Sequence, residues 1–217
     1  MPTGVLRLFL IRHGEAIGNA EMRYLGCRDD PLTEHGRWQA DCLAQAFRAL
    51  PVHAIYTSPL QRTLATASAI ARACERPLYL EARLREASSG IWEGLTRAEV
   101  LARSAEDAQQ LHQWEQNADC APPGGESLQE VQVRALDFIE ELTCTYTDEW
   151  LVLVTHVSPI KAILCATLNI PLINGRHLFL DPATISVIDW GSRPILRLFN
   201  AHTHLGWTAA RWMHTPY

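Results

Sequence analysis

The sequence predicts an α/β fold, a three-layer α/β/α sandwich around a mostly parallel sheet. Short apolar runs that suit buried strands alternate with longer segments whose apolar residues recur at helical spacing, and this alternation is typical of α/β proteins. Two late apolar runs, at 184–190 and 195–199, are joined by Gly191-Ser192-Arg193-Pro194. This pattern predicts a hairpin that completes the sheet.

The first half of the chain predicts three strands and two helices. The run Val5–Ile11 is almost continuously apolar, which suits a strand covered on both faces. Ser58-Pro59 has the capping residue and first-turn proline of a helix that runs to about Cys74. An earlier helix, capped by Thr33, is expected to bury Leu43, Ala46, Phe47 and Leu50. The expected strands of this half are 5–11, 53–56 and 78–80.

Two capping boxes organise the second half. Thr96 with Glu99, and Ser127 with Glu130, have the spacing at which the two side chains satisfy each other's backbone N–H groups. The second box opens a long helix with one apolar face: Leu128, Val131, Ala135, Phe138 and Leu142. The remaining expected elements are a strand at 150–154, a helix at 159–168 and the late hairpin.

One domain is expected over residues 1–217, with a small cap insertion at about 95–125. Within it, Ala102 to Gly125 is the least regular part of the sequence and ends in Pro122-Pro123-Gly124-Gly125. We expect this insertion to lie over the functional site. Trp92 and Trp114 are candidates for the mouth of the pocket.

Composition narrows the function classes. The chain is 47% hydrophobic and 20% charged with a formal net charge of −5, so we expect neither bulk-charge nucleic-acid binding nor disorder. The longest apolar region, 151–173, is interrupted by His156, Pro159 and Lys161, so no membrane association is expected. Six scattered cysteines without a CxxC pair indicate reduced thiols in a cytoplasmic protein, and no signal peptide is expected.

Two Arg, two His and one Glu are expected at one edge of the sheet. Arg12 and His13 follow the first strand, Arg62 follows the second, and His156 follows the strand at 150–154. Glu86 lies between these segments in sequence. Because ligands of open α/β sheets bind beyond the carboxyl ends of the strands, these side chains form a candidate site.

This set of residues favours phosphoryl chemistry without a metal. Arg forks match phosphate oxygens, an unprotonated His can attack phosphorus, and a carboxyl group can protonate the leaving oxygen. Taken singly, each residue has an alternative interpretation: a solvated Arg-His pair, a core histidine at His156, or a surface ion pair between Arg85 and Glu86. Their joint position favours the functional interpretation.

Seven sequence motifs, in the same order along the chain, resemble those of one known family. Leu10-Ile11-Arg12-His13-Gly14-Glu15 resembles the signature of the histidine phosphatase superfamily, the phosphoglycerate mutase-like proteins, and the similarity extends over nearly the whole chain. Six further segments match in order: Asp30-Pro31-Leu32-Thr33, Ser58-Pro59-Leu60-Gln61-Arg62-Thr63, Leu84-Arg85-Glu86, Gly90-Ile91-Trp92-Glu93-Gly94, Gly124-Gly125-Glu126-Ser127 and Val154-Thr155-His156.

The resemblance implies a role for each matched residue. His13 would be the nucleophile that becomes phosphohistidine, and Glu86 would be the proton donor. The phosphoryl oxygens would be bound by four residues: Arg12, Asn19, Arg62 and His156.

Two further features of the sequence bear on the branch within the family. Phosphoglycerate mutases of this family carry Arg-His-Tyr after the proton donor, whereas this chain has Ala87-Ser88-Ser89, and residues 102–125 offer one cation, Arg103, among several acids. The stretches Val157–Ala162 and His202–Gly206 resemble the metal-independent phosphoserine phosphatase branch. The substrate-binding candidates are Leu25, Gly26, Ser89 and His204, although that branch tends to have a polar residue at the position of Leu25 and a His at that of Ser89.

The leading hypothesis is a metal-independent phosphomonoesterase that acts on a small phosphorylated metabolite, with phosphoserine as a candidate. A phosphoglycerate mutase, an α-ribazole or broad-specificity phosphatase, and a non-catalytic regulatory member stay open as alternatives. We expect no cofactor and no metal; the paired histidines His202 and His204 lack a nearby third ligand. A homodimer is also left open.

Overall fold

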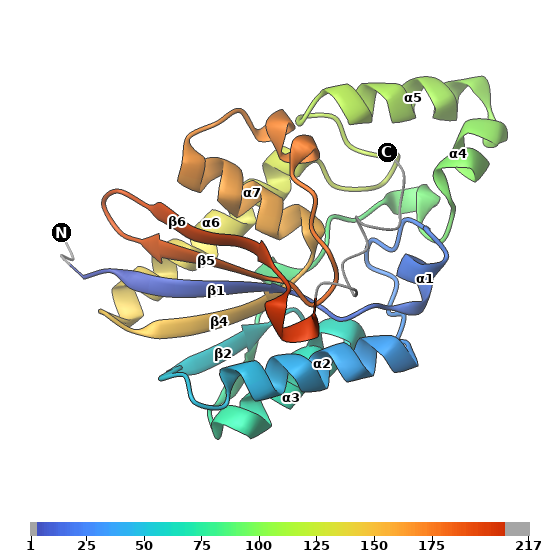
Figure 1. The fold of residues 1–217 in the computed structure, drawn as a ribbon. Helices are drawn as coiled ribbons and strands as arrows, with labels where there is room; N and C mark the ends of the chain where they lie inside the picture. The colour runs from blue at the N-terminus through green and yellow to red at the C-terminus, as the bar shows by residue number, and fades with distance from the viewer. Residues whose placement is uncertain (1–3, 207–217) are drawn as a thin grey trace.

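The computed structural model describes residues 4–206, and its centre is a six-stranded sheet in the order β3-β2-β4-β1-β5-β6 (Figure 1). β2 pairs in parallel with β3 and β4, and β4 with β1, whereas β5 is antiparallel to both β1 and β6. The strands are β1 (Leu6–Arg12), β2 (Ala54–Thr57), β3 (Leu78–Leu80), β4 (Trp150–Thr155), β5 (Ile185–Trp190) and β6 (Ile195–Ala201). The predicted strands and the late hairpin are thereby confirmed.

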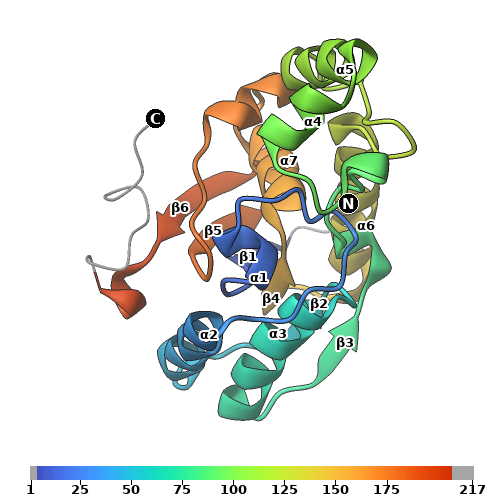
Figure 2. The same cartoon turned by 90° about the vertical axis from the view of Figure 1, so that its right-hand side faces the viewer.

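Helices cover both faces of the sheet, which confirms the three-layer prediction (Figures 1 and 2). Alternate residues of β1 point to opposite layers: Leu8 and Leu10 pack with α6 and α7, whereas Phe9 and Ile11 pack with α2 and α3. The seven α-helices of the described residues are α1 (Ile17–Ala20), α2 (Glu34–Phe47), α3 (Gln61–Cys74), α4 (Arg97–Arg103), α5 (Ala105–Gln116), α6 (Leu128–Thr145) and α7 (Val157–Leu168). Short 3₁₀ turns occur at η1 (Ala82–Leu84), η2 (Gly90–Trp92), η3 (Leu172–His177) and η4 (Thr203–Leu205). Within residues 4–206, none of the helices has the length and apolar character needed to span a bilayer.

Two predicted helix starts are wrong by two residues. α3 begins at Gln61, not at Ser58-Pro59, because the Asp29 carboxylate accepts the Gln61 backbone N–H at 2.6 Å and thus supplies the cap from a distant loop. The Ser58 hydroxyl instead lies 3.0 Å from His156 Nε2. α7 begins at Val157, directly after His156, and Pro159 occupies its first turn.

The segment 95–125 is more regular than the sequence suggested. α4 and α5 lie beyond the carboxyl ends of β1 and β4 (Figure 1), and the side chains of Thr96 and Ser104 cap them. Trp92 packs with Val100 and Leu111 in a small core of its own, and its indole donates to Asp107 at 2.7 Å. Trp92 is therefore a structural residue of this segment and does not line the pocket mouth.

A pair of glycines holds the loop after β1 against α2. A Cβ on Gly36 would lie 2.0 Å from the Glu15 carbonyl oxygen, and one on Gly14 would lie 2.5 Å from the Gly36 carbonyl oxygen. Both positions thus require glycine because backbone packs directly on backbone. The Gly14 N–H also donates to Thr66 on α3 at 3.1 Å, so two helices position the loop that carries His13.

We predict that Gly36→Ala destabilises the protein although alanine is the better helix former. The favourable helix propensity is about 1 kcal/mol, and overpacking against rigid backbone costs about 1–3 kcal/mol, so a net loss is expected in urea unfolding. Gly191→Ala is the matched control, because its Cβ would sit at an ordinary 3.4 Å from the nearest atom. Equal stability of the two variants would contradict this packing.

Candidate active site

The pairing of β1 with β4 brings the two candidate histidines together. Arg12 is in register with Thr155, and the His13 N–H donates to the Thr155 carbonyl at 3.1 Å. The rings of His13 and His156 consequently lie with their centroids 5.0 Å apart. A cavity of about 220 Å³ opens at this edge of the sheet. Eight of the ten predicted site residues line it: Arg12, His13, Asn19, Leu25, Gly26, Arg62, Glu86 and Ser89.

The imidazole of His13 is buried and held in one tautomer. Nδ1 lies 2.7 Å from the Gly14 carbonyl oxygen, which can only accept, so Nδ1 carries the proton. Nε2 then has the lone pair and accepts a hydrogen bond from Arg62 Nε at 3.2 Å. Desolvation, followed by the charges of Arg62 and Arg12, holds the pKa of His13 well below its usual value. His13 is therefore neutral at physiological pH, with a nucleophilic nitrogen beside a guanidinium.

Arg62 connects the site to the loop that follows α1. Its side chain is fully buried, and two guanidinium nitrogens donate to the carbonyls of Arg28 (2.5 Å) and Gly26 (2.9 Å). With the bond to His13, three of its five N–H groups are used, so two are left for an anion. Arg12 extends from the end of β1 and donates to the Leu180 carbonyl at 2.6 Å. The two arginines thus reach the cavity from different elements.

His156 lies behind the cavity wall at the start of α7 and is fully buried. Its Nε2 lies 3.0 Å from the Ser58 hydroxyl, whereas its buried Nδ1 has no hydrogen-bond partner among residues 4–206. Burial, then the neighbouring His13, Arg62 and Arg12, lowers the pKa of His156 well below its usual value. When the Ser58 hydroxyl donates to Nε2, Nδ1 carries the proton and is a buried donor without an acceptor.

Glu86 is held by one of its two carboxyl oxygens. Oε1 accepts the N–H groups of Ala87 at 2.9 Å and of Ser158 at 3.1 Å, the latter at the N-terminus of α7. Oε2 makes no hydrogen bond within the described residues and is the oxygen left to carry a proton. The arrangement suits a carboxyl group that gives and takes a proton on one side.

Glu93, a carboxylate outside the predicted set of site residues, positions this loop. Glu93 Oε1 accepts from the N–H of Cys27 at 2.9 Å, the hydroxyl of Ser88 at 3.2 Å and the N–H of Ser89 at 3.3 Å. Gly26 has a φ of +49°, and a Cβ there would lie 2.3 Å from that same oxygen. Its place in the Gly90–Gly94 motif was the only signal for Glu93 in the sequence. The cavity is completed by Arg23, Tyr24, Ala87, Trp114, Val157 and Ser158.

The expectation that His204 faces the substrate is not met in the described part of the chain. His204 lies in η4, and its Nε2 is 2.9 Å from the Ala183 carbonyl oxygen. The Ala183 N–H in turn donates to the His13 carbonyl at 3.0 Å. Because its ring nitrogen is engaged with backbone behind β1, His204 supports the His13 segment and does not line the cavity.

Asn19 presents its amide to the cavity from the short helix α1. Its Oδ1 accepts the Ala16 N–H at 3.0 Å, so its NH₂ group is the part available to an anion. In the part of the chain that the structure describes, no three His, Cys, Asp or Glu residues come together as a metal site would require. The cavity lining therefore combines one neutral imidazole, guanidinium donors and one carboxyl group.

Comparison with known proteins identifies this arrangement. The family model of the histidine phosphatase superfamily (branch 1) matches residues 8–201. Phosphoserine phosphatase 1 of Hydrogenobacter thermophilus is 36% identical over 205 residues, which cover 93% of this chain and 95% of that protein. A probable phosphoglycerate mutase of Cronobacter sakazakii is 35% identical over 88% of each chain. The solved structure of a mycobacterial glucosyl-3-phosphoglycerate phosphatase superposes with a TM-score of 0.82 at 31% identity, covering 91% of this chain and all of that one.

The family model spans both the loop that carries Arg12 and His13 and the strand that leads to His156. The similarity to phosphatases extends over the sheet, the helical layers and the segment above the site. The chain thus belongs to branch 1 of the histidine phosphatase superfamily and is a phosphoric monoester hydrolase.

Proposed function

We propose that the protein hydrolyses a small phosphorylated metabolite through a phosphohistidine on His13, without a metal. The observation that carries this proposal is the tautomer of His13: Nδ1–H is bound to the Gly14 carbonyl, and the Nε2 lone pair lies beside Arg62. A neutral, fixed imidazole next to a cation combines a nucleophile with a site for the phosphoryl group that it attacks.

In the first step, His13 Nε2 forms a bond to phosphorus while the bond between phosphorus and the leaving oxygen breaks. Glu86 gives the proton on Oε2 to that oxygen, so the alcohol departs neutral. Arg12, Arg62, Asn19 and His156 bind the three phosphoryl oxygens and stabilise the charge that develops on them. His156 does so as a neutral donor, which its lowered pKa supports.

In the second step, a water molecule replaces the alcohol. Glu86, now a carboxylate, takes a proton from the water as its oxygen attacks phosphorus. The bond between phosphorus and Nε2 breaks, its electron pair returns to His13, and phosphate is released. The enzyme is restored with a protonated Glu86 and a neutral His13.

Phosphoserine is our candidate substrate because the relative from Hydrogenobacter thermophilus is a phosphoserine phosphatase. Leu25, Gly26 and Ser89 line the cavity and would contact the part of the substrate that leaves. All six cysteines are free thiols, which supports a reducing compartment such as the cytoplasm. Hydrolysis of phosphoserine and 3-phosphoglycerate should be assayed in parallel with mutase activity, which separates this proposal from the isomerase alternative.

Removal of divalent metals should leave hydrolysis unchanged, because guanidinium and imidazole donors supply the charge stabilisation. The measurement is the rate with p-nitrophenyl phosphate after dialysis against EDTA, with and without added Mg²⁺ or Zn²⁺. Loss of activity on dialysis that added metal restores would contradict the mechanism.

His13→Ala should abolish hydrolysis and the covalent intermediate together. We expect a loss of several powers of ten, because the remaining groups can bind phosphate but cannot attack it. The phosphoenzyme is trapped from wild type with labelled substrate and an alkaline quench, which preserves acid-labile phosphohistidine. His53→Ala is the control, since His53 is half-exposed and pairs with Glu149 at 3.3 Å, next to the opposite end of the sheet. An active His13→Ala variant without trapped label would rule out this nucleophile.

Glu86→Gln should slow alkyl phosphates by about 10²–10⁴-fold, and p-nitrophenyl phosphate much less. An alkoxide leaves poorly unless it is protonated, whereas p-nitrophenolate is stable as the anion. The comparison is kcat on phosphoserine and on p-nitrophenyl phosphate, with Glu140→Gln on the exposed side of α6 as the control. Equal losses on both substrates would assign the proton to another group.

A further inference from the structure

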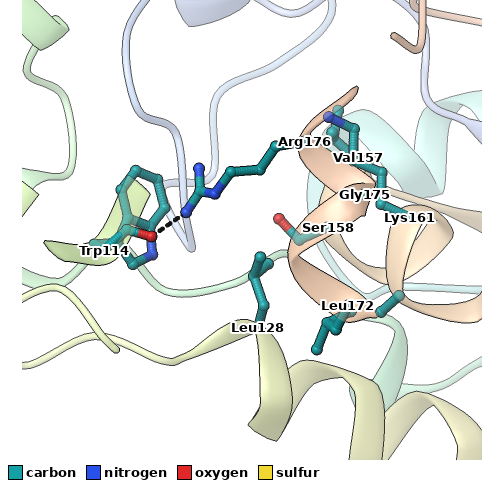
Figure 3. Close-up of a pocket in the computed structure, with 9 residues that line it drawn as sticks. Trp114, Leu128, Val157, Ser158, Lys161, Leu172, Gly175 and Arg176 are labelled. Atoms are coloured by element: carbon teal, nitrogen blue, oxygen red, sulfur yellow. Dashed lines mark hydrogen bonds between the residues drawn. The ribbon is translucent and has the colours of Figure 1, made fainter. Parts of the chain in front are cut away.

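A second cavity, of about 190 Å³ and drawn in Figure 3, adjoins the phosphoryl site. The two cavities share three lining residues, Trp114, Val157 and Ser158. Ser158 connects them chemically: its backbone N–H holds Glu86 Oε1, and its side-chain oxygen points into the space between Leu128 and Arg176 in Figure 3. A leaving group that takes its proton from Glu86 therefore has a path over Ser158 into this cavity.

The cavity contains the only lysine of the chain. Lys161 lies three residues after Ser158 on α7 and is partly buried. Within residues 4–206 its ammonium group has neither an ion-pair partner nor a hydrogen-bond acceptor. Its pKa is lowered to about 8, chiefly by burial and then by the charges of Arg12 and Arg176, while Glu86 and Cys165 act in the opposite direction. A partly desolvated cation without a paired counter-charge costs free energy, and a bound anion would offset that cost.

Arg176 provides a second cation from η3. Its guanidinium lies 4.7 Å from the centre of the Trp114 ring, and Nη2 donates to the Trp114 carbonyl (Figure 3). Its Nε is buried and has no hydrogen-bond partner among the described residues. Glu115, whose charge acts on Arg176, is engaged in an ion pair with Arg97 at 2.7 Å. Arg176 is thus fixed in place with a donor still to be satisfied.

The rest of the cavity wall is apolar. Leu128 and Leu172 come from α6 and η3, and Trp114 comes from α5. A ligand that suits this wall has a short carbon skeleton and one compact anionic group. A carboxylate fits because its two oxygens match an ammonium, a guanidinium N–H and a hydroxyl.

We propose that this cavity binds a carboxylate on the leaving half of the substrate, with Lys161, Arg176 and Ser158 as its donors. The inference rests on the phosphatase function proposed above and narrows the substrate to phosphate esters of small hydroxy acids. It also places the second anion site on α7 and η3, and not on the helical segment 95–125.

The test compares two substrates that differ in one group, 3-phosphoglycerate and glycerol 3-phosphate, in which CH₂OH replaces the carboxylate. Wild type should prefer 3-phosphoglycerate in kcat/KM, and Lys161→Met should reduce that preference by about tenfold or more. Lys161→Arg should retain most of it because the charge remains. Arg193→Met, which removes one positive charge at the exposed hairpin turn, should leave the preference unchanged.

The pH dependence provides a second readout. Lys161 binds a carboxylate only when protonated, so the preference should be complete well below pH 8 and decline as pH rises through about 8. Hydrolysis of glycerol 3-phosphate depends on the same His13, Glu86 and His156. The ratio of the two kcat/KM values therefore cancels the effects of these three residues.

Binding to the His13→Ala variant, measured by calorimetry, separates this inference from the proposed function. His13→Ala should bind 3-phosphoglycerate more tightly than glycerol 3-phosphate, and the double variant His13→Ala/Lys161→Met should lose this difference. That result supports the carboxylate site even if the wild-type enzyme transfers the phosphoryl group to an acceptor other than water. Hydrolysis of both substrates with equal kcat/KM, or a preference that Lys161→Met leaves intact, would overturn the carboxylate site while the phosphatase function stands.

Discussion

The parallel pairing of β1 with β4 is the constraint on which the site depends. Hydrogen bonding in register places Arg12 beside Thr155 and lets the His13 N–H bind the Thr155 carbonyl. A shift by one residue would turn Arg12 toward the opposite face and separate His13 from His156. Both strands are buried on two faces by apolar packing, so the free energy that stabilises the core also holds the two histidines in place.

Electrostatics then determines how these groups act. Two guanidinium groups and complete burial keep His13 and His156 neutral, so the positive charge resides on arginines that do not titrate. The division suits phosphoryl transfer, in which one group must attack and the others must stabilise negative charge. Lys161 extends the same positive field to a neighbouring cavity, where burial makes its charge sensitive to pH.

The helical segment above the site illustrates where sequence patterns were insufficient. Both capping boxes were predicted correctly and are formed, because a box depends on residues three apart. The pattern over 102–125 indicated an irregular segment, yet α5 forms there, since its apolar contacts come from Trp92 and Tyr24 elsewhere in the chain. The start of α3 was displaced for the same reason: its cap, Asp29, is 32 residues away.

The sequence by itself determined the fold class, the family and the residues expected at the sheet edge, because strand periodicity, helix caps and the Arg12-His13-Gly14 motif are all local. The tertiary structure alone decided which nitrogen of His13 carries the proton, that His204 contacts Ala183 behind β1, and that Lys161 and Arg176 share a cavity with Trp114. The contacts of His204 and Lys161 join segments far apart in the chain. The tautomer of His13 is set by the adjacent Gly14 carbonyl together with Arg62, 49 residues away. In each case packing and burial set both geometry and charge.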